Sequence, residues 1–257
     1  MLTKSEAKLL HALKSRSGRE KHSAFTVEGV RVLEELITAG IDLKFAVVSP
    51  TLEDSARGRA LAEALAARTT VRRVREAELR ELADTDTPQG VIAAARVPQH
   101  DLARVKLSEQ AIVVVLDAIQ DPGNLGTLIR SADAFAVACV LALPGTVDYW
   151  NPKVVRSAAG AAFRVSLTSA IADDAWRWLT VNQFIVCGAD TRGDDIERAQ
   201  LTGRVAIVVG NEGSGLRNET RKHVDRLLSI PMQGRAESLN VAAAAAILLY
   251  ELSRSNR

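Results

Sequence analysis

The chain has 257 residues, of which 47% are hydrophobic and 25% are charged, proportions typical of an ordinary globular protein and not of a disordered one. Its formal net charge of +2 is only mildly basic, so charge alone does not indicate a nucleic-acid partner. The length exceeds that of a usual single domain, and we therefore expect two domains.

The cysteine and histidine content argues against a disulfide framework and a metal site, and the sequence carries no membrane signal. Cys139 and Cys187 each lie in an apolar run, which predicts two buried thiols and excludes a cysteine-rich zinc site. The four histidines have no metal-ligand spacing, so we expect no metal. No stretch approaches the roughly 20 apolar residues that span a bilayer, and residues 1–23 lack the apolar core of a signal peptide. We expect a cytoplasmic protein without membrane contact.

Residues 1–97 predict a basic N-terminal helix followed by a small α/β domain. Residues 3–16 have apolar side chains at helical spacing, and the basic stretch SRSGREKHS follows as a loop. The excess of basic residues before Ser23 indicates either a solvated helix or a nucleic-acid contact. Apolar runs then alternate with amphipathic ones. They predict strands at AFTVEG, KFAVVS, TVRRV and GVIAAARV, and helices around Val30–Thr38, Ser55–Ala67 and Glu76–Leu82.

Residues 98–110, PQHDLARVKLSEQ, are polar and interrupt this alternation, so they predict a linker before a second domain at 111–257. AIVVVL (111–116) is typical of a central parallel strand that is buried on both faces. Pro122 and Gly123 predict a turn after it, and Asn124 is expected to cap the next helix. Further elements are a strand at 137–143, a short helix with Lys153 and Arg156, a helix with Trp176 and Trp178, and strands at FIVCGAD and 205–209.

A glycine-rich loop, in VAIVVGNEGSGL, connects the strand at 205–209 to a helix near Leu216–His223. Its spacing is G-x-x-G-x-G, whereas the dinucleotide-binding fingerprint is G-x-G-x-x-G. It also lacks the Lys and Ser/Thr of a phosphate-binding P-loop. By itself this loop predicts only a tight turn.

The last stretch, Ser229–Leu252, combines the end of an apolar strand, an irregular turn and an alanine-rich helix. Pro231 ends the strand because it has no N–H donor, so residues 231–236 predict an irregular loop. We expect the helix to start at Glu237 and Ser238. The alanines at 242–246 permit another backbone to approach closely, and polar groups at the entrance of the helix can face a ligand.

Three separated segments together resemble the motifs of a known family. LDAIQDPGNLGTLIRSADAF (116–135), VAIVVGNEGSGL (205–216) and SIPMQGRAESLNVAAAAAILLYE (229–251) resemble, in order and spacing, the three motifs of the SpoU/TrmH family. That family comprises RNA ribose 2′-O-methyltransferases of the SPOUT superfamily. NPKVVRSAAGAAFRV (151–165) is similar to the family's connecting segment. More loosely, AFTVEGVRVLEEL (24–36) resembles the ribosomal-protein-like RNA substrate-binding domain that is often attached.

The resemblance implies an α/β fold in which a mostly parallel sheet contains a deep trefoil knot that binds S-adenosylmethionine. It implies cofactor contacts at Gly210, Ile230 and Leu239, with Met232 and Leu143 as walls of the site. It also implies an active site without a metal, formed by Asn124, Arg130, Glu212, Ser238 and Asn240. A homodimer through the C-terminal helix is a further implication.

We expect Arg130 to hold an RNA phosphate or the ribose 2′-oxygen, since a guanidinium is a poor proton acceptor. Asn124 and the Glu212–Ser238–Asn240 group would orient it. The expected substrate is structured RNA, ribosomal more than transfer RNA. The alternative is a noncatalytic knotted RNA-binding or ribosome-assembly factor. Other readings stay open: base stacking or packing by tryptophans 150, 176 and 178, and RNA contact or simple solvation for Lys153, Arg156 and Arg235.

Overall fold

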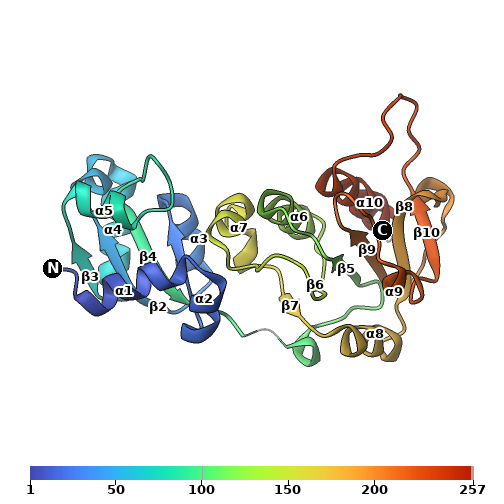
Figure 1. The fold of residues 1–257 in the computed structure, drawn as a ribbon, viewed down its shortest axis with the longest axis horizontal. Helices are drawn as coiled ribbons and strands as arrows, with labels where there is room; N and C mark the ends of the chain where they lie inside the picture. The colour runs from blue at the N-terminus through green and yellow to red at the C-terminus, as the bar shows by residue number, and fades with distance from the viewer. Residues whose placement is uncertain (100, 256–257) are drawn as a thin grey trace. The chain divides into compact units, whose positions relative to one another are not determined.

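The computed structural model describes residues 1–99 and 101–255, which form two compact units (Figure 1). Unit 1 comprises Met1–Gln99 together with Asp148–Phe163. Unit 2 comprises the described residues of 100–147 and 164–257. Within the described ranges, no helix is both long enough and apolar enough to cross a membrane.

Unit 1 is built on a four-stranded sheet in the order β1-β4-β2-β3. β4 is antiparallel to both of its neighbours, whereas β2 and β3 are parallel. β4 is the central strand of its sheet, and its first five residues are all buried because both faces are covered. The strands are β1 (Ala24–Glu28), β2 (Leu43–Val48), β3 (Val71–Arg73) and β4 (Val91–Arg96), as the apolar runs predict.

The helices of unit 1 follow the predicted order, with one correction near the N-terminus. The basic stretch that we expected to be a loop forms a helix, because the Ser15 hydroxyl accepts a hydrogen bond from the Gly18 N–H and caps it. The α-helices are α1 (Lys4–Leu13), α2 (Arg16–His22), α3 (Val30–Thr38), α4 (Ala56–Ala66), α5 (Glu76–Leu82) and α7 (Pro152–Ala158). The short 3₁₀ turns are η1 (Pro50–Asp54) and η3 (Ala161–Phe163).

Unit 2 contains a six-stranded sheet in the order β10-β8-β9-β5-β6-β7, and every neighbouring pair is parallel. The mostly parallel sheet that the resemblance implies is therefore confirmed. β5 is buried along its whole length, as its continuous apolar run predicts. The strands are β5 (Ile112–Asp117), β6 (Cys139–Ala142), β7 (Leu167–Ser169), β8 (Ile185–Asp195), β9 (Val205–Gly210) and β10 (Arg226–Ser229).

Helices cover both faces of this sheet, with α6 and α10 on one side and α8 on the other (Figure 1). Trp176 and Leu179 of α8 pack with Val113, Val115 and Val208 in one core cluster. The helices are α6 (Pro122–Ala134), α8 (Ala172–Val181), α9 (Asn218–Arg221) and α10 (Val241–Ser255), and the 3₁₀ turns are η2 (Leu102–Arg104) and η4 (Ile196–Arg198).

Two helix starts in unit 2 differ from the sequence-based expectation. Asp121, and not Asn124, caps α6, because its carboxylate accepts a hydrogen bond of 2.7 Å from the Asn124 N–H. α10 begins at Val241 and not at Glu237, because the Asn240 Oδ1 accepts hydrogen bonds from the N–H groups of Ala242 and Ala243. Residues 231–240 therefore remain irregular, and the chain between β10 and α10 projects from the sheet (Figure 1).

Candidate active site

The site lies where two adjacent parallel strands, β5 and β9, reach their carboxyl ends. Asp117 and Gly210 are paired in the last step of their register. The loops that follow these strands meet at this edge, which is where ligands bind in open α/β sheets. Residues 118–121 form the first loop, which leads into α6, and residues 211–217 form the second.

Three side chains from separate segments form a continuous chain of hydrogen bonds at this edge. The Asn240 amide Nδ2 donates to the Asn124 Oδ1 at 2.9 Å. The Asn124 Nδ2 in turn donates to the Glu212 Oε1 at 3.1 Å. Because an amide carries both a donor and an acceptor, Asn124 can link its two neighbours. The network connects the start of α10, the start of α6 and the loop after β9.

Glu212 accepts several further hydrogen bonds, which keep it ionised. The N–H groups of Gln120 and Asp121 donate to its two carboxylate oxygens at 3.3 and 3.2 Å. Partial burial raises the pKa of Glu212, but hydrogen bonds from Asn124 and from backbone N–H groups outweigh burial and hold it below its ordinary 4.5. The carboxylate therefore acts as a fixed acceptor around which the loop after β5 is arranged.

The loop after β9 is held at both of its ends. A Cβ on Gly210 would lie 2.3 Å from the carbonyl carbon of Gly215, so only glycine permits this close approach. At the far end, the buried Asp117 carboxylate accepts a hydrogen bond of 2.8 Å from the Arg217 N–H and a second bond from its guanidinium. This geometry fixes the position of Glu212 between the two anchors.

A pocket of about 660 Å³ opens beside this network. Eight predicted site residues line it: Asn124, Gly210, Glu212, Ile230, Met232, Ser238, Leu239 and Asn240. Ser238 is exposed and forms no hydrogen bond with any residue in the described part of the chain.

Two predicted site residues lie outside this pocket. Leu143 is 2% exposed and packs in the core cluster with Trp176 and Leu216, so its side chain is not a pocket wall here. Arg130 is exposed on α6 and makes no hydrogen bond or ion pair with the residues that the structure describes. Its guanidinium is free to bind a ligand that approaches from solvent.

The pocket also contains charged residues that sequence reasoning missed. Asp190, at the middle of β8, is nearly buried, and it accepts hydrogen bonds from the Arg192 N–H and the Arg221 guanidinium. Burial raises the pKa of Asp190, but these hydrogen bonds lower it to about 2. The available signal was the GAD sequence, in which the apolar run of this strand gives way to a charged residue, because polar residues toward the carboxyl end of a parallel strand face the ligand edge.

Several other candidates have structural roles. Trp150 packs on Phe25, Trp176 stacks on His223, and Trp178 stacks on Phe184, so packing accounts for all three tryptophans. Cys139 and Cys187 are buried as predicted, and burial raises the pKa of each thiol to about 11. No cluster of three or more His, Cys, Asp or Glu residues within residues 1–99 and 101–255 is arranged to hold a metal ion.

The fold is that of an α/β protein with a pocket at the carboxyl edge of a parallel sheet and a fixed polar network beside that pocket. The SpoU rRNA Methylase family matches residues 111–250, and an MRM3-like substrate binding domain matches residues 4–93. The chain belongs to the SpoU rRNA methylase family.

Full-length relatives agree with this assignment. The 23S rRNA (guanosine(2553)-2′-O)-methyltransferase RlmP of Bacillus subtilis strain 168 is 34% identical over 252 residues, which cover 95% of this chain and 93% of the relative. The 23S rRNA (uridine(2479)-2′-O)-methyltransferase of Streptomyces viridochromogenes is 32% identical over 94% of this chain and 86% of its own. The solved structure of the SpoU methyltransferase AviRb from Streptomyces viridochromogenes, in complex with AdoMet, superposes with a TM-score of 0.91 at 30% identity, covering 99% of this chain and all of that one.

Proposed function

We propose that this protein transfers a methyl group from S-adenosylmethionine to a ribose 2′-hydroxyl of ribosomal RNA. The observation that carries the proposal is the Asn240–Asn124–Glu212 chain at the edge of the pocket. The three residues come from the three segments that resemble the family motifs. Both relatives named above are 23S rRNA 2′-O-methyltransferases, which favours ribosomal RNA over transfer RNA as the substrate.

The pocket fits the proposed cofactor in size and in chemistry. Its volume of about 660 Å³ lies within the usual range for a small-molecule site. Apolar side chains at Ile230, Met232 and Leu239 can enclose a nucleoside, while polar groups and backbone amides of the loops can bind its heteroatoms. When bound, S-adenosylmethionine supplies an activated methyl group on a sulfonium.

The residues of the chain act by positioning the ribose. Arg130 holds the phosphate or the 2′-oxygen of the target nucleotide, because its exposed guanidinium is free and cannot act as a base. Glu212 is also a weak base, since its pKa is lowered, so its role is to fix Asn124. Asn124, Ser238 and Asn240 then orient the hydroxyl for in-line attack, and such alignment is a large part of what the reaction requires.

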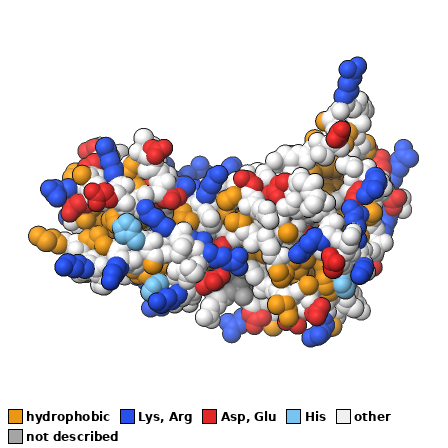
Figure 2. Space-filling view, viewed as in Figure 1, with side chains coloured by type: hydrophobic (Ala, Val, Ile, Leu, Met, Phe, Trp, Pro, Cys, Tyr) orange, Lys and Arg blue, Asp and Glu red, His pale blue; other side chains and the backbone are white. Residues whose placement is uncertain are grey.

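Residues 1–97 serve to bind RNA in this proposal, and residues 111–257 carry the reaction. Basic side chains lie interspersed with acidic ones on the face of unit 1 drawn in Figure 2. Lys4, Lys8, Lys21 and Lys153 are exposed and form no ion pair with any described residue, so they are free for phosphates. The guanidiniums of Arg16 and Arg156 are already paired with Glu20 and Asp84. In this proposal the protein acts in the cytoplasm, because its substrate is ribosomal RNA.

The protein also forms a homodimer in this proposal. Ala243, Ile247 and Tyr250 of α10 are exposed at a spacing that puts them on one face of the helix. The Phe135 ring follows α6 and packs edge-on against the Tyr250 ring, with the two ring centroids 6.1 Å apart. Phe135 thereby extends this apolar stripe. An apolar stripe of this kind on a soluble helix is suited to pairing with a second copy.

The test is methyl transfer from labelled S-adenosylmethionine to ribosomal RNA that lacks its own modifications. The wild type should label the RNA, and Arg130→Ala should abolish labelling while leaving cofactor affinity unchanged. Arg177→Ala is the control, because Arg177 is also exposed but lies on α8 and pairs with Asp174. Cofactor binding without any transfer by the wild type would favour the noncatalytic RNA-binding alternative.

A further inference from the structure

The segment Asp148–Phe163 has an unusual place in the molecule. In sequence it lies between β6 and β7, two neighbouring strands of the sheet in unit 2, but it packs with unit 1. The Trp150 ring centroid is 4.5 Å from that of Phe25 in β1, and the Phe163 centroid is 6.2 Å from it. The segment lies within residues 111–257, which the sequence predicts as the second domain, and its Trp150 and Phe163 rings pack on Phe25 of unit 1.

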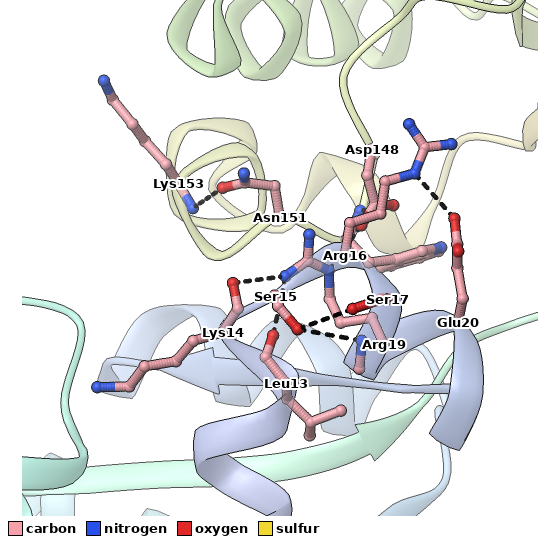
Figure 3. Close-up of polar contacts among 12 residues, drawn as sticks. Leu13, Lys14, Ser15, Arg16, Ser17, Arg19, Glu20, Asp148, Asn151 and Lys153 are labelled. Carbon is pink, nitrogen blue, oxygen red and sulfur yellow. Dashed lines mark hydrogen bonds and ion pairs between the residues drawn. The ribbon is translucent and has the colours of Figure 1, made fainter.

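An ion pair anchors the first residue of this segment. Arg19 of α2 is only 4% exposed, and its Nε donates to the Asp148 Oδ2 at 2.6 Å (Figure 3). Its Nη1 donates to the backbone carbonyls of Leu13 and Lys14 at 2.8 and 3.1 Å. The Asp148 Oδ1 accepts a hydrogen bond of 3.0 Å from the Trp150 N–H. Both carboxylate oxygens are therefore used, and the buried guanidinium has its charge neutralised.

The residues just before Asp148 bind to the loop that carries the candidate active site. The Val147 N–H donates to the Ile119 carbonyl at 2.8 Å, and the buried Thr146 hydroxyl donates to the Leu116 carbonyl at 3.2 Å. Gln120 and Asp121, which follow Ile119, donate their N–H groups to Glu212. Asp148 is therefore one peptide bond from Val147, which is hydrogen-bonded to Ile119, and the two residues after Ile119 are hydrogen-bonded to Glu212.

We infer that Arg19 and Asp148 are a positioning pair for methyl transfer. The pair fixes Asp148, the residue that follows the loop after β6, and that loop is hydrogen-bonded to the loop beside Glu212. The pair thereby couples RNA held by unit 1 to the orientation of the Asn124–Glu212 network. This inference rests on the proposed function. It differs from a purely structural role, in which the pair would stabilise unit 1 without affecting the reaction.

The test uses the full-length protein and the variant Asp148→Asn, whose amide keeps the acceptor for Trp150 but lacks the charge. Affinity for ribosomal RNA, affinity for S-adenosylmethionine and the single-turnover rate with both saturating are measured well below the melting temperature. The rate should fall about ten- to a hundredfold, because small displacements of reacting groups have effects of that size. Both affinities should stay within about twofold of the wild type.

Two further variants make the result specific. Glu34→Gln also removes a carboxylate from an ion pair of unit 1, because the Glu34 Oε1 accepts a hydrogen bond of 2.8 Å from the Arg57 Nε. This pair joins α3 to α4, away from Asp148. The single-turnover rate of Glu34→Gln should therefore equal that of the wild type. Arg19→Lys keeps the positive charge and loses the planar fork, and it should give an intermediate rate. If Asp148→Asn does not fold, the same measurements on Arg19→Lys test the inference.

An unchanged single-turnover rate in Asp148→Asn, even with a lower melting temperature, would make the pair merely structural and would overturn the inference. Loss of RNA affinity alone, with a normal rate at saturation, would also overturn it. A wild type that transfers no methyl group contradicts the proposed function, and the inference with it. An active wild type with an equally active variant contradicts the inference alone.

Discussion

At the scale of the residue, the site depends on side chains that can accept and donate at the same time. Asn124 accepts a hydrogen bond from Asn240 and donates one to Glu212. The Glu212 carboxylate also accepts hydrogen bonds from two backbone N–H groups of the loop after β5. The carboxylate organises this arrangement because it offers two oxygens and no competing donor. Replacement of that carboxylate should therefore disturb the whole network.

The variant Glu212→Gln should reduce the methyl-transfer rate by about tenfold or more, because hydrogen bonds to a charged acceptor are lost and the new amide donor faces backbone N–H groups. The pKa of Glu212 is lowered on folding, so its contribution to stability is present above the ordinary carboxyl range and is lost as the pH falls through the lowered pKa. The melting-temperature difference between the two proteins should thus be largest at neutral pH and should shrink on acidification. A difference that is equal at neutral and strongly acidic pH would contradict this role.

The sequence predicted much of this site because the motifs specify order and spacing along the chain. Asn124, Glu212 and Asn240 lie in three distant segments, and the structure brings them within hydrogen-bonding distance. The direction of a side chain depends on packing, which spacing does not encode. Leu143 follows β6 and turns into the core with Trp176, and Arg130 lies on α6 outside the pocket.

At the scale of the element, long apolar runs predicted the strands well, whereas short helices and helix ends were less predictable. α2 has seven residues, several of them poor helix formers, and its formation depends on the Ser15 cap and on the burial of Arg19. We expected Glu237 and Ser238 to start the last helix, but Asn240 caps it two residues after Ser238. Such choices depend on tertiary contacts and on local competition between caps.

Asn240 has two separable duties, which two substitutions can distinguish. Asn240→Asp keeps the oxygen that caps α10 but cannot donate to Asn124, so it should retain the wild-type melting temperature and slow methyl transfer about tenfold. Asn240→Ala should slow transfer equally and should also destabilise the protein by about 1 kcal/mol through loss of the cap. Thermal melting and single-turnover assays on both variants check this. Full activity in Asn240→Asp would remove its amide from the mechanism.

At the scale of the whole molecule, two features could not come from local sequence patterns. The packing of residues 148–163 with unit 1 depends on aromatic contacts with Phe25, a residue more than a hundred positions away. The trefoil knot stays a prediction of the resemblance, since it is a property of the chain path and not of composition.

The proposed homodimer gives a prediction at the same scale. Ile247→Glu places a charge in the exposed apolar stripe of α10, so it should shift the protein from dimer to monomer in sedimentation at micromolar concentration. Glu219→Gln, on α9, is a control that alters charge away from this stripe and should leave the dimer intact. A wild type that sediments as a monomer would contradict the proposal.

We propose that the network beside the pocket directs a methyl group onto one ribose oxygen of ribosomal RNA. The most direct measurement is the position of the methyl group in 23S rRNA that lacks its own modifications, after incubation with S-adenosylmethionine and either the wild type or Asn124→Ala. We predict one 2′-O-methylated nucleotide, resistant to alkaline cleavage, with the wild type and none with the variant. A methyl group on a base, or the same modified ribose with Asn124→Ala, would contradict this role of the network.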